Sequence, residues 1–344
     1  MIKRKLGRTG LEVSALGMGC YQFTSDFGIA TETADAILDY AMDSEINLFD
    51  SAQSYGFGES EEIVGRARRR HPGKKAVFTS KVGYFLRNTR MEEGAVTREL
   101  DESAFTNPAE IKRAVKRSLW RLQLDCLDVM MIHEYNWPQW RVDYDTGESV
   151  VLTALKELRQ EGVIGAIGLG GWDLERAAQM VRTGKFDVVL AAGGMNLLSR
   201  PMFDELVPAC REQNTGLILG GGFGQNNPLL VSKDRATLEK LCGEENASIR
   251  GMVKKMEQLY DLADELEVSM TELAIRYILS FEEIHSHVPG ARELIHIQSN
   301  LAAAERGPLG AGVVKRINAI QRDGETLSPL DMAVLSSKLR GTCQ

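Results

Sequence analysis

Short apolar runs recur along this sequence, and each is followed by a stretch in which apolar residues return at helical spacing. Because the runs are short and apolar, they are interpreted as buried strands. Eight can be recognised, at residues 15–19, 46–49, 76–80, 127–132, 163–169, 187–191, 216–219 and 284–288. Regular alternation of strands and helices predicts a parallel sheet covered by helices.

The helical stretches have recognisable boundaries. Asn107–Pro108 combines a capping side chain with a proline at the first helical position. Residues 5–13 predict a small β-hairpin, whereas 84–105 and 135–148 lack periodicity and are expected to be long loops. Helices are expected at about 31–43, 60–69, 107–122, 151–160, 174–182, 202–213, 270–281, 295–304 and 312–321. A longer helical region is expected at roughly 235–265, and a short terminal helix is expected to open at Ser328–Pro329.

Glycines at the strand ends decide between two architectures, a barrel and a doubly wound sheet. They follow the later strands at 170–171, 193–194, 220–224 and 290, at the end where barrel enzymes build their sites. No GxGxxG follows the first strand, which removes the best support for a doubly wound sheet. We therefore expect an α/β fold, a (β/α)8 TIM barrel forming a single domain over residues 1–344. The hairpin would precede the barrel, and extra helices would follow it.

Composition narrows the classes of partner. The net charge of −7 argues against nucleic acid and against an anionic membrane surface. The five cysteines are scattered without metal-ligand spacing, so no metal is expected, and their pattern suggests a reducing compartment. With neither a signal-peptide pattern nor a long apolar stretch, we expect a cytoplasmic protein whose partner is a small molecule.

Polar residues stand where three of the predicted strands end. Asp50, Lys81 and His133 each terminate an apolar run, and Tyr55 lies on the loop just beyond Asp50. Taken singly, Asp50 would be interpreted as a helix cap, Lys81 as a solvated surface cation and His133 as a core histidine. Together at neighbouring strand ends, they are typical of a site for proton transfer.

These residues, in this order and spacing, resemble the motifs of the aldo-keto reductase family. The similar segments are residues 50–56 (Asp-Ser-Ala-Gln-Ser-Tyr-Gly), 58–65, Lys81, His133, the opening Leu6–Gly10, and residues 288–292 with Asn300. The resemblance implies a (β/α)8 barrel that binds NAD or NADP with the nicotinamide over the barrel mouth. It also implies a catalytic tetrad: Tyr55 as general acid and base, Lys81 and Asp50 biasing it, and His133 orienting the substrate oxygen.

The cofactor residues depart from the family pattern at both ends of the dinucleotide. At the adenosine end Asn300 matches, Gly290 and Ala291 replace a basic and a hydroxyl residue, and His296 replaces an arginine. Arg292 remains as the candidate to bind the 2′-phosphate of NADP. At the nicotinamide end the usual Ser-Asn and Gln are Gly170–Gly171 and Ala192, so backbone groups are expected to substitute. The implied cofactor-binding set is Gly19, Asp50, Gly170, Gly171, Gly222, Gly224, Gly290, Arg292, His296 and Asn300, with NAD or NADP left open.

A weaker resemblance to the family's sugar 1-dehydrogenase branch suggests the substrate class. Tyr21, Trp137 and Trp140 are expected to bind substrate, with polar neighbours available for hydroxyl groups (Glu134, Asn136, Gln139 and Asp143). The tryptophans would alternatively form a hydrophobic lid packed on itself. Two other functions remain open: a general aldehyde or ketone reductase, and a cofactor-binding regulatory barrel with little turnover.

Overall fold

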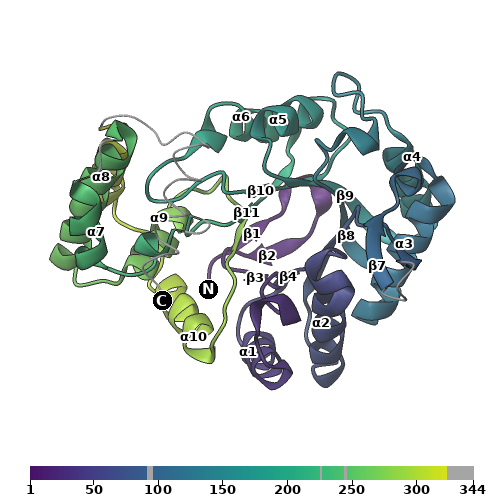
Figure 1. Ribbon diagram of the computed structural model, residues 1–344, viewed down its shortest axis with the longest axis horizontal. Helices are drawn as coiled ribbons and strands as arrows, with labels where there is room; N and C mark the ends of the chain where they lie inside the picture. The colour runs from purple at the N-terminus through teal and green to yellow at the C-terminus, as the bar shows by residue number, and fades with distance from the viewer. Residues whose placement is uncertain (91–95, 225–226, 244–245, 324–344) are drawn as a thin grey trace.

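Eight parallel strands close into a barrel at the centre of the protein (Figure 1). The computed structural model describes residues 1–90, 96–224, 227–243 and 246–323. Neighbouring strands of the sheet follow in chain order, and a parallel bridge between Leu16 and His287 joins its two ends. The barrel strands are β3 (Met18–Gly19), β4 (Leu48–Asp50), β5 (Val77–Val82), β8 (Leu127–His133), β9 (Ile164–Gly171), β10 (Val188–Ala192), β11 (Gly216–Gly220) and β12 (Ser286–Val288). The predicted (β/α)8 barrel is thereby confirmed.

Helices surround the barrel, and α7 and α8 lie farthest from it, at the left of Figure 1. They are α1 (Thr31–Asp43), α2 (Glu59–Arg70), α3 (Pro108–Leu122), α4 (Val150–Gln160), α5 (Leu174–Arg182), α6 (Leu206–Gln213), α7 (Arg235–Cys242), α8 (Ala247–Glu265), α9 (Met270–Leu279), α10 (Leu294–Glu305) and α11 (Ala311–Arg322). The Asn107 side chain accepts the Ala109 amide at 3.0 Å, as its capping position predicts. Across the described ranges, no helix combines the length and apolar character needed to cross a bilayer.

The N-terminal hairpin, β1 (Lys3–Lys5) and β2 (Glu12–Ser14), closes one end of the barrel. Its Leu6 and Val13 are fully buried and pack with the inward-facing residues of the barrel strands, Leu48, Val77, Val129, Met131, Ala166, Val188, Leu190, Ile218 and Val288. A second, larger apolar cluster fills the space between the strands and the helices. The interior of the barrel is therefore a packed core, as the fold requires.

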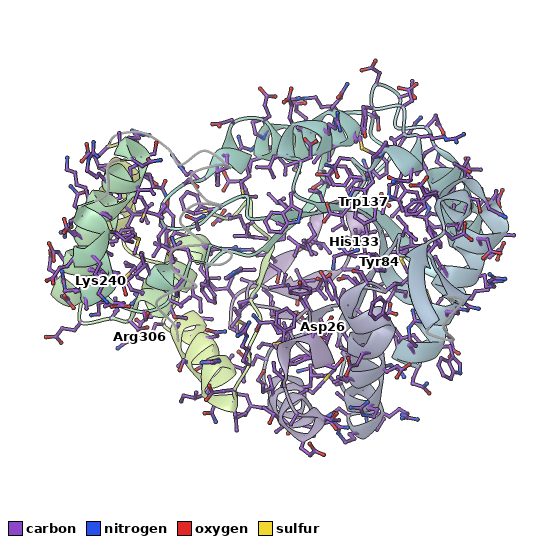
Figure 2. The ribbon with its side chains drawn as sticks, in the orientation of Figure 1. Asp26, Tyr84, His133, Trp137, Lys240 and Arg306 are labelled. Carbon is purple, nitrogen blue, oxygen red and sulfur yellow. The ribbon has the colours of Figure 1, made fainter. Side chains whose placement is uncertain are left out.

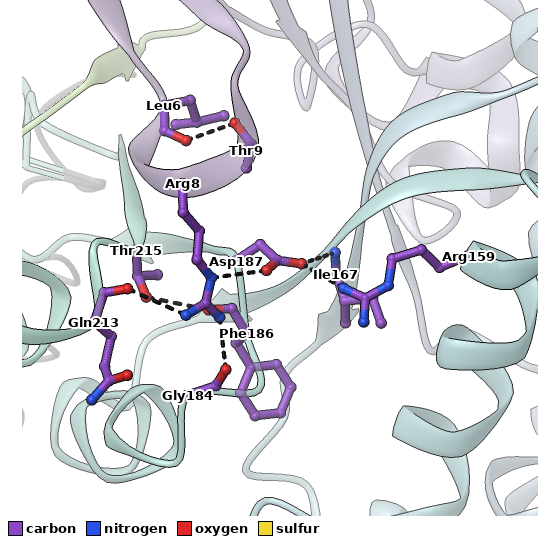
Figure 3. Close-up of polar contacts among 10 residues, drawn as sticks. All are labelled: Leu6, Arg8, Thr9, Arg159, Ile167, Gly184, Phe186, Asp187, Gln213 and Thr215. Carbon is purple, nitrogen blue, oxygen red and sulfur yellow. Dashed lines mark hydrogen bonds and ion pairs between the residues drawn. The ribbon is translucent and has the colours of Figure 1, made fainter.

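Arg8 holds this hairpin against the amino ends of β10 and β11 (Figure 3). Its guanidinium donates to Asp187 at 3.0 Å and to the carbonyl groups of Gly184, Phe186 and Gln213. At Gly7 a Cβ atom would lie 2.3 Å from the Gly216 nitrogen, so only glycine fits this contact. The hairpin therefore covers the end of the barrel opposite the ends of the strands that bear Asp50 and His133.

Two expectations about local structure need correction. Residues 84–105 are not a plain loop, because β6 (Leu86–Arg90) and β7 (Val96–Leu100) pair antiparallel and a short 3-10 helix follows at Glu102–Thr106. The helix expected at 202–213 is a 3-10 turn (Pro201–Phe203) followed by α6, whereas the helical region expected at 235–265 is present as two helices, α7 and α8. The expected Ser328–Pro329 helix lies outside the described residues.

Candidate active site

The ammonium group of Lys81 lies at the centre of the end of the barrel opposite the hairpin. Lys81 is 1% exposed and projects from β5. Its Nζ donates to Asp50 Oδ2 at 2.7 Å, to the Ser51 carbonyl at 2.8 Å and to the Tyr55 hydroxyl at 3.1 Å. All three ammonium hydrogens therefore have partners, and Lys81 links the carboxylate to the phenol.

Asp50 keeps Lys81 charged despite its burial. Burial is the largest single effect and would lower the pKa of Lys81, but the Asp50 carboxylate and the Tyr55 hydroxyl together outweigh it and raise this pKa. The other carboxylate oxygen of Asp50 accepts the Thr79 hydroxyl at 2.6 Å. Sequence reasoning missed Thr79, although its position two residues before Lys81 on a strand places both on one face.

A tight turn presents Tyr55 to Lys81. In the 3-10 segment Tyr55–Gly58, both Gly56 (φ 57) and Phe57 (φ 55) adopt left-handed backbone conformations, which are unusual for a bulky residue such as phenylalanine. Burial raises the pKa of the Tyr55 hydroxyl, and this effect exceeds the lowering caused by Lys81. Tyr55 is therefore protonated at neutral pH and able to donate a proton.

His133 completes the group from the end of β8. Its ring lies edge-on to the Tyr55 ring, with centroids 5.9 Å apart. Burial, and secondarily the Lys81 charge, lowers the pKa of His133 to about 3, so the imidazole is neutral. Its carbonyl accepts the Trp140 indole N–H at 2.9 Å, and its Nδ1 lies 3.2 Å from the Ser54 hydroxyl. The structure thus brings together all four residues that the sequence singled out.

Exposed aromatic side chains lie beside this group. Tyr21, predicted from the sequence, is 50% exposed and packs edge-on to Tyr55 at 4.8 Å. Trp137 is half-buried and lies near His133 and Tyr84 (Figure 2). Sequence reasoning missed Phe57 and Tyr84, whose rings continue this surface at 6.2 Å from each other. Phe57 lies between Gly56 and Gly58, which belong to the segments that resemble the family motifs. That position in the sequence could have indicated that Phe57 lies at the site.

Trp140 does not face the barrel mouth, which corrects the expectation that it binds substrate. It is fully buried, and its ring packs against Phe85 and Phe105 with centroids 5.9 and 4.6 Å away. Its indole N–H is occupied by the His133 carbonyl. Trp140 therefore supports the backbone of His133. Its packing against other aromatic rings is closer to the alternative expectation, in which the tryptophans pack among apolar groups and do not bind substrate.

The glycines expected at a cofactor lie at or just beyond the carboxyl ends of the barrel strands. Gly19, Gly170 and Gly171 end β3 and β9, whereas Gly222, Gly224 and Gly290 follow β11 and β12. At Gly170 a Cβ atom would approach the Lys81 stem to 3.1 Å, and at Gly222 it would lie 2.5 Å from His287 Nε2. Glycine at these two positions therefore lets the Lys81 and His287 side chains pack directly against the backbone at the mouth. Both ring nitrogens of His287 are buried without a partner among the described residues.

The remaining predicted cofactor residues lie on or before α10. Arg292 is exposed, stacks over the Phe27 ring at 5.3 Å and forms no ion pair with any described residue. His296 is exposed, and Asn300 is buried. The helix begins without a side-chain cap, so its first amide groups remain available to an anion.

Comparison with known proteins identifies a family to which the barrel and its four polar residues belong. The sequence model of the aldo/keto reductase family matches residues 15–322, which include Asp50, Tyr55, Lys81, His133 and all eight barrel strands. The chain belongs to the aldo/keto reductase family. This confirms the resemblance inferred from residues 50–56, Lys81 and His133.

Individual aldo/keto reductase relatives cover most of the chain. D-threo-aldose 1-dehydrogenase from Pseudomonas sp is 31% identical over 236 residues, which span 65% of this chain and 70% of that protein. NADH-specific methylglyoxal reductase from Escherichia coli is 27% identical over 321 residues, 88% of this chain and 93% of that protein. The holo form of the aldo-keto reductase AKR11C1 from Bacillus halodurans matches with a TM-score of 0.72 at 25% identity, over 96% of this chain and 99% of that one.

Aldo/keto reductases use a nicotinamide cofactor, and the residues at this barrel mouth fit such a group. At the strand ends, a side chain at Gly170 or Gly222 would press on Lys81 or His287, so glycine keeps both of these positions free of a side chain. Arg292 and the uncapped start of α10 supply a cation and amide donors suited to phosphate.

Proposed function

We propose that this aldo/keto reductase transfers hydride between a nicotinamide cofactor and a carbonyl or hydroxyl carbon, using Asp50, Tyr55, Lys81 and His133. The observation that best supports this is the triple contact of Lys81, which joins a buried carboxylate, a backbone carbonyl and the Tyr55 hydroxyl. A lysine held in this way places positive charge where a phenolate would form. Proton transfer at the Tyr55 oxygen is thereby coupled to a fixed cation.

Each residue has one task in the proposed reaction. The bound cofactor supplies or accepts the hydride. In reduction, Tyr55 gives its hydroxyl proton to the carbonyl oxygen as that oxygen becomes negative; in oxidation, the Tyr55 phenolate takes the alcohol proton. Lys81 stabilises the phenolate, and Asp50 holds Lys81. Neutral His133 donates a hydrogen bond to the substrate oxygen and orients it.

We infer that the substrate is a sugar or a similar polyhydroxylated compound. The relative whose printed name is D-threo-aldose 1-dehydrogenase supports this class. Near the mouth, the Glu134 carboxyl is half-buried with its pKa raised by burial, and the Asn136 side-chain oxygen is buried without a partner among the described residues. Such groups suit hydroxyl donors. Gln139 and Asp143 are less suitable, since they bond Glu102 and the backbone of their own loop.

A small-carbonyl reductase is the second candidate function. It is favoured by the relative named NADH-specific methylglyoxal reductase. For cofactor preference, Arg292 is the proposed partner of a 2′-phosphate, and the replacement of the neighbouring basic residue by Gly290 leaves NAD as the alternative.

Steady-state turnover separates these functions. Aldoses with NAD or NADP should be oxidised faster than aliphatic or aromatic aldehydes are reduced with NADH or NADPH. Trp137→Ala should raise KM for the best aldose, because its ring lies beside His133 and Tyr84 at the proposed site. Trp120→Ala is the matched control, since Trp120 is 70% exposed on α3. Robust reduction of simple aldehydes without oxidation of any aldose would contradict the sugar assignment, and no turnover with any substrate would favour the regulatory barrel.

A further inference from the structure

Ser54 contacts the histidine of the proposed site from the residue that precedes Tyr55. Its Oγ lies 3.2 Å from His133 Nδ1, and both side chains are half-buried. Ser54 adopts helical backbone angles (φ −70, ψ −21), and its carbonyl accepts the Phe57 amide, so the turn that presents Tyr55 also fixes Ser54. One short segment therefore contacts Lys81 through Tyr55 and His133 through Ser54.

The direction of this hydrogen bond follows from what each group can offer. A serine hydroxyl always carries a proton, and among the described residues His133 Nδ1 is the hydrogen-bond partner of the Ser54 hydroxyl. A neutral imidazole has one N–H and one acceptor nitrogen. If Nδ1 accepts from Ser54, the ring proton lies on Nε2. That nitrogen has no partner in the described part of the chain and, unlike both nitrogens of His287, is not a buried orphan.

We propose that Ser54 is a positioning residue that fixes the Nε2–H tautomer and the ring orientation of His133, so that this N–H points to the substrate oxygen. The proposal rests on the function proposed above, because it assumes that His133 meets the substrate. The Trp140 indole holds the backbone of the same histidine through its carbonyl, while Ser54 holds the ring. Without Ser54 the imidazole can rotate or exchange its proton between nitrogens, and a fraction of molecules then presents an acceptor to the developing alkoxide.

Nitrogen-15 NMR of histidine-labelled protein tests the tautomer without any need for turnover. His133 should be protonated on Nε2 in the wild-type protein, and Ser54→Ala should shift its Nδ1 resonance, with assignment from His133→Gln. His285 is an internal reference, because its Nδ1 accepts the Leu217 amide at 2.9 Å and must remain unprotonated. Protonation of wild-type His133 on Nδ1, or an Nδ1 resonance unmoved by Ser54→Ala, would overturn the proposal.

Kinetics test whether the contact matters for the reaction. Ser54→Ala should lower kcat about three- to tenfold, the range that corresponds to one ordinary hydrogen bond. Cofactor affinity should stay unchanged, and Ser54→Thr, which keeps the hydroxyl, should restore most of the rate. In a His133→Gln background the same substitution should have no further effect. A loss of equal size in that background would overturn the positioning role.

A control variant and a separate readout keep this test distinct from that of the proposed function. Ser44→Ala removes an equally half-buried hydroxyl that bonds only backbone atoms at the end of α1, and it should leave both kcat and the His133 spectrum unchanged. Full activity of Tyr55→Phe would refute the proposed chemistry while leaving the NMR result standing. If Ser54→Ala does not fold, the wild-type spectrum and Ser54→Thr still decide the tautomer.

Discussion

One buried ammonium group, that of Lys81, touches both the Asp50 carboxylate and the Tyr55 hydroxyl. At the scale of single residues, one hydroxyl group can be removed and the effect on turnover measured. Tyr55→Phe deletes the proton that the alkoxide needs and keeps the ring packed against Tyr21. We expect kcat to fall by about 10²–10⁴-fold, while cofactor affinity measured by fluorescence quenching changes by no more than a few fold. A near-normal kcat would exclude Tyr55 as the acid.

Arg292 is the residue on which cofactor preference is expected to depend. Arg292→Ala should weaken NADPH binding by about 1.5–3 kcal/mol and leave NADH binding nearly unchanged, because only NADPH offers a 2′-phosphate to the guanidinium. Arg306→Ala is the control, since Arg306 follows the other end of α10 and pairs with Glu272. Equal weakening of both cofactors in isothermal titration would assign Arg292 another role.

At the scale of elements, β8 separates β5 from β9, yet the Lys81 side chain of β5 packs against Gly170 of β9 because Gly170 has no side chain. A Cβ atom there would lie 3.1 Å from Lys81 Cδ, so Gly170→Ala must displace the lysine stem by a few tenths of an ångström. We expect kcat to fall about tenfold, with little loss in the urea midpoint, because misplacement costs catalysis more than packing. An unchanged kcat would show that the Lys81 ammonium group keeps its position when the carbon chain of the side chain is displaced.

The matched glycine substitution lies on α11. A Cβ atom on Gly312 would meet nothing within 4 Å, so Gly312→Ala should leave kcat alone and gain up to about 0.5–1 kcal/mol in unfolding free energy. The two variants together separate a local steric effect from a general response to replacing glycine.

For the whole molecule, buried neutral histidines make stability depend on pH. Burial lowers the pKa of His133 and of His287 to about 3, against about 6.5 in an unfolded chain. Between these values the unfolded chain binds protons that the folded chain does not, so stability falls as pH drops below about 6.5. Each histidine contributes a slope of up to roughly 1.4 kcal/mol per pH unit.

Urea unfolding at pH 7, 6 and 5 measures this slope. His287→Leu should reduce it and should stabilise the protein at pH 5, because it also removes two buried nitrogens that lack partners among the described residues. The slope of His296→Gln, which replaces an exposed histidine at the start of α10, is measured beside it for comparison. An identical slope in His287→Leu would mean that His287 titrates near its ordinary pKa when folded.

Much of the fold could be predicted because its signals are local. The eight strand runs, the Asn107 cap and the boundaries of α1 depend on spacing within a few residues, and the structure follows them. The positions of Asp50, Lys81 and His133 were also accessible, since a residue that ends a barrel strand must lie at the mouth. The sequence by itself therefore determined the barrel and the four residues at its centre.

The tertiary structure alone decided which side chains meet across the chain. The β6–β7 pairing escaped prediction because backbone hydrogen bonds between strands do not require an apolar pattern. Trp140 and Trp137 are alike in the sequence, yet the rings of Phe85 and Phe105 enclose only Trp140 completely. The Ser54–His133 contact joins residues 79 positions apart. No spacing rule reports such contacts, because they arise only when the closed barrel brings the ends of distant strands together.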